Sequence, residues 1–408
     1  MKKLIACLLV VLMAMSLVAC GSKEETPANS GSDTPASIKL GGSGPLTGAA
    51  AVYGNDVKNA AQLAVDEINA KEGYNFFEFN FQDDEADPTK APNAYGTLVD
   101  WGMQVSIYTT TSGAGLAVAQ DYYNDRVFAI TPSGSNPGLV YSADTNYDNL
   151  FQVCFTDPNQ GVASANYISE HKLGSKIAII YRSDDDYSTS IYNTFKTEAD
   201  KLGLEIVYAG AFVNTDSDYS TQLTAAQAAG ADLVFIPIYY DPASIILTQA
   251  NQMGYAPTFF AVDGLDGILG IEGFDASLAE GCYLLTPFAA DATDDKTVNF
   301  VSSFESKFGT TPTQFAADAY DAVYAIYEAC KAAGVTGDME ASEICDMMIA
   351  QVTSMTFEGL TGTCTWSDEN QGWSWTVTDS ETLSKFKEGG IYIAGLSDAT
   401  VTVTVSYE

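Results

Sequence analysis

The sequence has 408 residues, 46% of them hydrophobic and 12% aromatic, so the chain is long and apolar enough to bury the cores of two lobes. It carries 53 acidic against 18 basic side chains, a formal net charge of −35. Binding to nucleic acid or to an anionic membrane surface needs clustered Lys and Arg, so this composition argues against both partners.

The N-terminal segment has the pattern of a signal for export. Lys2 and Lys3 precede an apolar run that is too short to span a bilayer comfortably, and small residues follow it. The end of the run, LVAC, resembles a bacterial lipobox, which implies a signal peptide over residues 1–19 and acylation of Cys20. An ordinary secretion signal with a chance cysteine is the alternative. Residues 20–37 are rich in Gly, Ser, Pro and acids, which predicts a flexible tether outside the cytoplasmic membrane.

The cysteine and histidine pattern gives no sign of a metal site. Besides Cys7 and Cys20, five cysteines remain, and the chain has one histidine, His171. No spacing typical of Cys/His metal ligands occurs, and the acidic runs 83–85 and 184–186 lack the alternating spacing of a calcium loop. The sequence leaves open one disulfide among Cys330, Cys345 and Cys364.

Past the tether, short β-rich runs alternate with amphipathic runs of helical length. Strands are predicted near 37–42, 76–84, 104–109 and 127–132, with helices over 53–71, from Asp87 onward and after 111. The same unit recurs from 176 to 264, where Gly203, Gly230 and Gly254 end successive helices. This alternation predicts an α/β fold with two doubly wound parallel sheets, whose ligand site lies at the carboxyl ends of the strands.

Motifs for enzymatic chemistry are incomplete. The run GAGLAV has Val118 where a dinucleotide-binding fingerprint needs its third glycine, and GGSGPLTG lacks the lysine of a phosphate-binding loop. His171, at a predicted helix end, is better placed as a solvated residue than as a catalytic base. The sequence therefore predicts no cofactor and no catalysis, and an extracellular hydrolase is a weaker alternative.

The strand ends, taken together, resemble the Leu/Ile/Val-binding family of extracytoplasmic solute-binding proteins, the receptors of ATP-driven amino-acid importers. Segment 44–70 carries the most specific match, and the others are 109–119, 129–139, 184–196, 230–254, 259–267, 311–326 and 356–372. The resemblance implies the periplasmic binding protein type I fold, with lobes joined by a three-segment hinge that close on the ligand. It assigns residues 38–152 and 287–356 to the first lobe, and 153–286 and 357–408 to the second.

The resemblance also implies a ligand site. The first lobe would hold the α-carboxylate of an amino acid, and Asp263 of the second lobe would hold the ammonium group. Asp263 stands where the family often has glutamate, so its reach is one methylene shorter. The residues implied are Tyr53, Thr111, Ser112, Gly113, Ser133, Ser135, Tyr187, Tyr239 or Tyr240, Asp263 and Phe315. Taken singly, Ser112 is more typical of a helix N-cap, Asp263 before a glycine could be a turn residue, and the aromatics could as well be core residues.

The expected protein is thus a monomeric, lipid-anchored receptor on the outer face of the bacterial cell membrane. It would bind an aliphatic or branched amino acid and deliver it to the permease subunits of an ABC importer. Arg182 is the only arginine at the strand ends, which argues against a ligand with a second anionic group. Two alternatives keep the fold: a sensory receptor, and a receptor for a small amide or an aromatic acid.

Overall fold

The computed structural model describes residues 35–142, 145–366, 373–377, 392–393 and 401–404. The chain divides into two units, Met1–Pro35 and Ala36–Glu408, and the description below concerns the second. The predicted signal peptide, Cys20 and most of the predicted tether 20–37 lie outside the described residues and stay predictions. Within the described part, no helix is both long and apolar enough to cross a bilayer.

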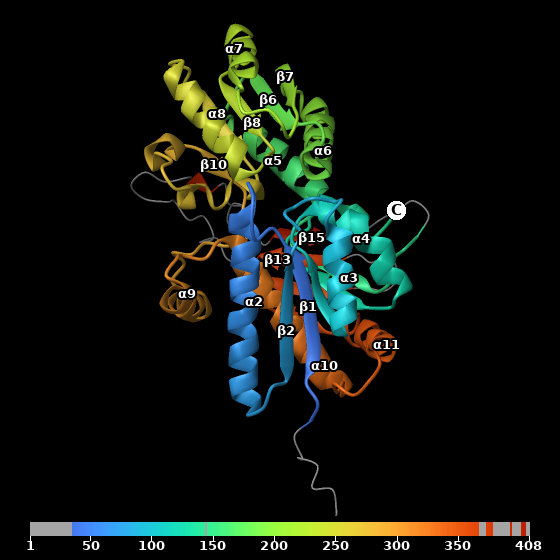
Figure 1. Cartoon of the computed structure of the whole chain (residues 1–408). Coiled ribbons are helices and arrows are strands. Elements are labelled where there is room, and N and C mark those ends of the chain that lie inside the picture. Colours follow the sequence, from blue (N-terminus) through green and yellow to red (C-terminus); the bar gives the residue numbers. More distant parts are fainter. Residues whose placement is uncertain (1–34, 143–144, 367–372, 378–391, 394–400, 405–408) are drawn as a thin grey trace, which may run out of the picture. The chain divides into compact units, whose positions relative to one another are not determined.

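The first sheet is parallel throughout, with strand order β2-β1-β3-β4-β5. Figure 1 labels its strands β1 and β2 and the helix α2 that connects them. Helices connect its successive strands, and α2 turns a stripe of Val57, Ala60, Ala64 and Ile68 into the core. Helix α3 begins at Ala91, later than the predicted Asp87, because residues 88–90 form a turn in which Asp87 accepts hydrogen bonds from Thr89. The elements are β1 (Ile38–Gly44), α2 (Ala51–Glu72), β2 (Phe77–Asp83), α3 (Ala91–Trp101), β3 (Val105–Thr109), α4 (Ser112–Asn124), β4 (Phe128–Thr131) and β5 (Leu150–Gln152).

The second sheet is also parallel, with strand order β14-β10-β9-β8-β6-β7. Its central strands β6, β8 and β9 are almost wholly buried. The predicted fold class, two parallel-sheet α/β lobes, is confirmed. The elements are α5 (Asp157–His171), β6 (Ile177–Arg182), α6 (Asp186–Leu202), β7 (Ile206–Phe212), α7 (Ser220–Ala228), β8 (Leu233–Ile236), α8 (Tyr240–Gln252), β9 (Thr258–Ala261), β10 (Tyr283–Leu284) and β14 (Tyr392–Ile393).

After β10 the chain returns to the first lobe through α9 (Asp295–Phe308), α10 (Gln314–Ala333) and α11 (Ala341–Val352). The hydroxyls of Tyr320 and Tyr324, on α10, both donate to Glu67 on α2. Lys331 pairs with Glu72 at 2.9 Å, on the same two helices. This packing is compatible with the expected return at 287–356, and the lobe boundaries themselves stay a prediction.

A third, antiparallel sheet follows, with order β11-β12-β13-β15, which the sequence did not lead us to expect. The indole N–H of Trp366 donates to the carbonyl oxygen of Gln152, at the end of β5, over 2.9 Å. Of the strands described within the predicted second-lobe segment 357–408, only β14 joins the second parallel sheet. The strands are β11 (Thr356–Glu358), β12 (Thr363–Trp366), β13 (Trp373–Val377) and β15 (Val401–Thr404).

The five cysteines in the described part of the chain are all free and buried. The disulfide that the sequence left open among Cys330, Cys345 and Cys364 therefore does not form. Burial raises the pKa of each of these three thiols, which keeps them protonated and unreactive.

Candidate functional site

Residues from several strand ends meet in one small pocket. It is lined by Tyr53, Thr110, Thr111, Ser112, Ser133, Ser135, Tyr187, Tyr239, Asp263, Gly264 and Phe315. Of the site residues predicted from the sequence, Gly113 and Tyr240 do not line this pocket. Thr110 and Gly264 line it without having been nominated.

The first-lobe side of the pocket is formed by hydroxyl groups and the start of α4. Thr111 is the N-cap of α4, and Ser112 is its first residue, but neither side chain caps the helix. The hydroxyl of Ser112 instead accepts a hydrogen bond from the Asn136 N–H at 3.2 Å, so the N-cap reading of Ser112 is wrong. The hydroxyl of Ser133 donates to the Thr110 carbonyl oxygen at 2.6 Å. Because the first N–H groups of a helix have no partner within it, this side is suited to a small anion.

The second-lobe side contains a buried carboxylate. The Asp263 residue is 5% exposed and opens a short 3₁₀ turn, Asp263–Leu265. The Tyr187 hydroxyl donates to its Oδ1 atom and accepts from the Gly264 N–H at 3.0 Å. No lysine or arginine in the described ranges forms an ion pair with Asp263. Burial removes the charged carboxylate of Asp263 from water, and no cation compensates for this loss. The pKa of Asp263 is therefore raised to about 6.

The atoms around Gly264 leave no room for a side chain at this position. A Cβ atom on Gly264 would lie 2.7 Å from the Tyr187 hydroxyl and 2.8 Å from the Ile238 carbonyl oxygen. Both contacts are closer than van der Waals packing allows. Any larger residue would therefore displace Tyr187 from Asp263.

Aromatic rings close the rest of the pocket around Tyr53. The ring of Tyr53 lies 4.4 Å from Phe315, 5.3 Å from Tyr239 and 4.9 Å from Tyr240, centroid to centroid. Its hydroxyl donates to the Gly264 carbonyl oxygen and accepts from the Tyr240 N–H. The Tyr240 hydroxyl accepts from the Val52 N–H at 3.1 Å, so Tyr240 supports Tyr53 without lining the pocket.

The side chains nearly fill their own pocket. The space between them is about 10 Å³, the room that a single water molecule needs. A molecule larger than water therefore enters this pocket only when the aromatic side chains, or the lobes that bear them, move apart.

A second buried acid, which was not predicted from the sequence, lies beside the site. Asp157, the first residue of α5, is 0% exposed, and within the described residues neither carboxylate oxygen has a hydrogen-bond partner. Its N–H donates to the Ser135 carbonyl oxygen at 2.9 Å, and burial raises its pKa well above the ordinary value. Gln160 of the same helix accepts from the Asp263 N–H at 3.2 Å. The sequence DPNQ is typical of the start of any helix, so it does not predict that Asp157 and Gln160 lie beside the site.

No group of three or more His, Cys, Asp or Glu side chains in the described residues is arranged to hold a metal ion.

Comparison with known proteins identifies the family. The sequence profile described as "Periplasmic binding protein" matches residues 37–374. The chain belongs to this family. Leu/Ile/Val-binding protein homolog 1 of Brucella abortus is 26% identical over 305 residues, covering 73% of this chain and 79% of the relative. Leu/Ile/Val-binding protein BraC3 of Rhizobium johnstonii is 27% identical over 309 residues, which cover 75% of this chain and 82% of the relative.

Solved structures agree with the fold. The branched-chain amino acid transporter substrate-binding protein LivJ of Streptococcus pneumoniae, in complex with isoleucine, superposes with a TM-score of 0.74. It is 27% identical, and the match covers 90% of this chain and all of that one. A solute-binding protein of an ABC transporter from R. palustris, in complex with benzoate, shares the fold, with a TM-score of 0.75. It is 20% identical, and the match covers 91% of this chain and 98% of that one. The resemblance to the branched-chain amino-acid group of this family is thus confirmed.

Proposed function

We propose that the protein is the receptor of an ABC importer for a neutral amino acid with an aliphatic or branched side chain. One observation carries the proposal: a buried carboxylate without a cationic partner, Asp263, lines the same pocket as Ser112 and the start of α4. An amino acid is a zwitterion that offers one group of each charge to such a pocket.

The two sides of the pocket complement the two charges of the ligand. A buried charge costs several kcal/mol unless it is paired, so both ends of the zwitterion need partners. Hydroxyls of Ser112 and Ser135 and the N–H groups at the α4 start would bind the carboxylate, in charge-assisted hydrogen bonds. The carboxylate of Asp263 would bind the ammonium group, and the bound cation would return its pKa toward the ordinary range.

The rings of Tyr53 and Phe315 would cover the ligand's side chain. Their apolar faces favour an aliphatic group, and the names of the Leu/Ile/Val-binding relatives and the isoleucine in LivJ support the branched class.

The cellular setting belongs to the same proposal. The lipobox pattern supports acylation of Cys20 and anchoring to the outer face of the cell membrane. The family supports a location outside the cytoplasm and delivery to permease subunits. We propose a monomer without catalytic activity, and a sensory output is the alternative with the same fold.

A second candidate ligand is an aromatic acid, because the R. palustris protein with this fold holds benzoate and the pocket is rich in rings. A benzoate lacks the ammonium group, however, and would leave Asp263 unpaired. The amino acid is therefore favoured.

Calorimetric titration of the purified protein with the neutral amino acids, small amides and benzoates tests the proposal. We expect one aliphatic class to bind with a micromolar Kd or tighter, about −8 kcal/mol. Binding of benzoates or amides in place of amino acids would overturn the proposed ligand class.

A further inference from the structure

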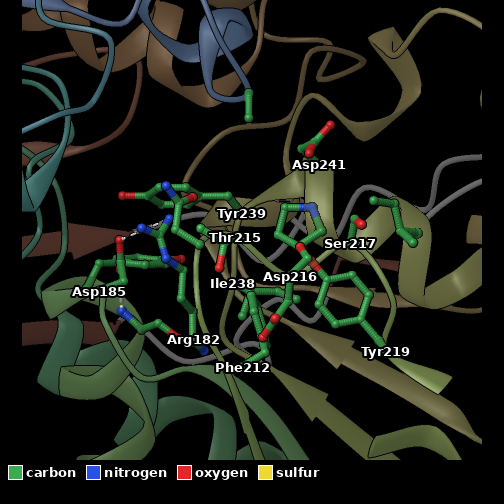
Figure 2. Close-up of a pocket in the computed structure, with 16 residues that line it drawn as sticks. Arg182, Asp185, Phe212, Thr215, Asp216, Ser217, Tyr219, Ile238, Tyr239 and Asp241 are labelled. Atoms are coloured by element: carbon green, nitrogen blue, oxygen red, sulfur yellow. Dashed lines mark hydrogen bonds and ion pairs between the residues drawn. The ribbon is translucent and has the colours of Figure 1, made fainter. Parts of the chain in front are cut away.

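A second and larger cavity adjoins the candidate site. It lies at the carboxyl ends of β6, β7 and β8, and its volume is about 280 Å³ (Figure 2). Tyr187 and Tyr239 line both this cavity and the small pocket, so the two spaces are separated by these two side chains. Apart from Ala49, all residues that line the larger cavity come from the second lobe.

The lining combines an apolar wall with an excess of carboxylates. Phe212, Ile238 and Ile245 contribute apolar surface. The charged side chains in the lining are one arginine, Arg182, and three aspartates, Asp185, Asp216 and Asp241. At neutral pH a cation in this cavity would be attracted, and an anion repelled.

Arg182 is paired with two aspartates of its own loop. Its Nε atom donates to Asp184 at 2.9 Å, and its Nη1 atom lies 3.9 Å from Asp185. Figure 2 shows Arg182 and Asp185 facing each other, with Asp241 elsewhere along the cavity wall. The arginine is thus neutralised by its own neighbours.

Asp241 is the carboxylate left without a partner. Within the described residues no donor bonds to its side chain, and partial burial raises its pKa. Asp216 accepts one bond, from the Val213 N–H at 2.9 Å. These two acids are therefore the groups that a bound cation would reach.

The wall between the two spaces can open at one side chain. Tyr187 is held by Asp263 and by the Gly264 N–H. The Tyr239 hydroxyl makes no hydrogen bond within the described part of the chain, and its ring is held by contacts with Tyr53 and Tyr187, 5.3 and 5.1 Å away. A rotation of Tyr239 would join the cavity to the site at the cost of ring contacts alone.

We propose that this cavity extends the amino-acid site and takes a long side chain with an apolar stem and a terminal cation, as in basic amino acids. The proposal rests on the proposed function, because the α-carboxylate and α-ammonium of the ligand stay at Ser112 and Asp263. The stem passes Tyr239 along the apolar wall, and the terminal cation meets Asp241 and Asp216. The receptor then accepts basic as well as aliphatic amino acids.

Lysine and norleucine form a matched pair for the test, because they share the same four-carbon stem and differ in the terminal ammonium. We expect lysine to bind at least tenfold more tightly than norleucine in calorimetry at pH 7.5 and low salt. Asp241→Asn should reduce that difference at least threefold, with Asp216 still in place, while norleucine affinity changes less than twofold. Asp200→Asn, on the exposed face of α6 and outside both spaces, is the control and should change neither.

Each outcome separates the extension from the function on which it rests. If leucine binds and lysine binds no more tightly than norleucine, the extension is wrong and the proposed function stands. An unchanged preference for lysine in Asp241→Asn also overturns the extension. If cadaverine, which lacks the α-carboxylate, binds as tightly as lysine, the cavity is an independent amine site. If no amino acid binds, the proposed function and the extension fall together.

Discussion

Replacing Asp263 by asparagine removes one charge and little else. The asparagine has the same shape, and its carbonyl oxygen can still accept the hydrogen bond from the Tyr187 hydroxyl. What disappears is the partner for the ligand's ammonium group in a pocket where Asp263 is 5% exposed. Removing one partner of a buried ion pair costs about 3–5 kcal/mol. Leucine should therefore bind roughly a hundredfold to several thousandfold more weakly.

The same substitution should make the unliganded protein more stable. Burial raises the pKa of Asp263 from 3.8 to about 6, so the folded state holds its proton more tightly than the unfolded state does. The proton on Asp263 therefore adds to the free energy of unfolding. This contribution is complete below the unfolded pKa of 3.8 and is lost as the pH rises through 6. At pH 7.5 the charged side chain thus costs on the order of 3 kcal/mol, which the neutral asparagine avoids.

Calorimetry with leucine and thermal unfolding without ligand, both at pH 7.5, measure the two effects. We expect a weaker Kd together with a higher Tm, a combination that a misfolded variant cannot produce. Asp200→Asn should leave both values unchanged. A Kd for Asp263→Asn within threefold of the wild type would refute the assignment of Asp263 to the ammonium group.

Three further expectations concern the same pocket. Ser112→Ala should weaken leucine binding by about 1.5–3 kcal/mol, the worth of a hydrogen bond to a charged group, and should lower the Tm slightly because the Asn136 N–H loses its acceptor; an unchanged Kd in calorimetry would remove Ser112 from the carboxylate side. Gly264→Ala should weaken leucine binding by about 1–3 kcal/mol, because the new methyl overlaps both the Tyr187 hydroxyl and the Ile238 carbonyl oxygen; an unchanged Kd in calorimetry would contradict the role given to Gly264. Below pH 6 the affinity for leucine should fall by about tenfold per unit as Asp263 becomes protonated, and Asp263→Asn should show a flat profile over the same range.

Much of the fold is predictable because local pattern and tertiary packing agree. The strand-helix alternation, with Gly203 and Gly254 at helix ends, needs no long-range information, and both parallel sheets follow from it. The antiparallel sheet was missed because its first two strands, Thr356–Glu358 and Thr363–Trp366, are 3 and 4 residues long. Its attachment depends on a contact of Trp366 with Gln152, 214 positions away in the chain.

The pocket lining was largely predicted because parallel strands end at one edge of a sheet, and the family resemblance then selected residues at those ends. The sequence does not predict which neighbouring side chains hold these lining residues in place. The role of Gly264 depends on the Tyr187 side chain, 77 positions away. Asp157 has the sequence of a common helix start, and its complete burial becomes visible only when the strands and helices are assembled.

The near absence of free space in the pocket has a kinetic consequence. The Tyr53 hydroxyl bonds to the Gly264 carbonyl oxygen and about 10 Å³ remains, so under the proposed function each binding event waits for this contact to break. The observed association rate should rise with ligand concentration and then level off at the opening rate, which is the same for every ligand. The receptor's affinity is then the intrinsic affinity multiplied by the fraction of molecules that are open. Residues that only hold the closed form together therefore set how quickly solute is captured, without touching it.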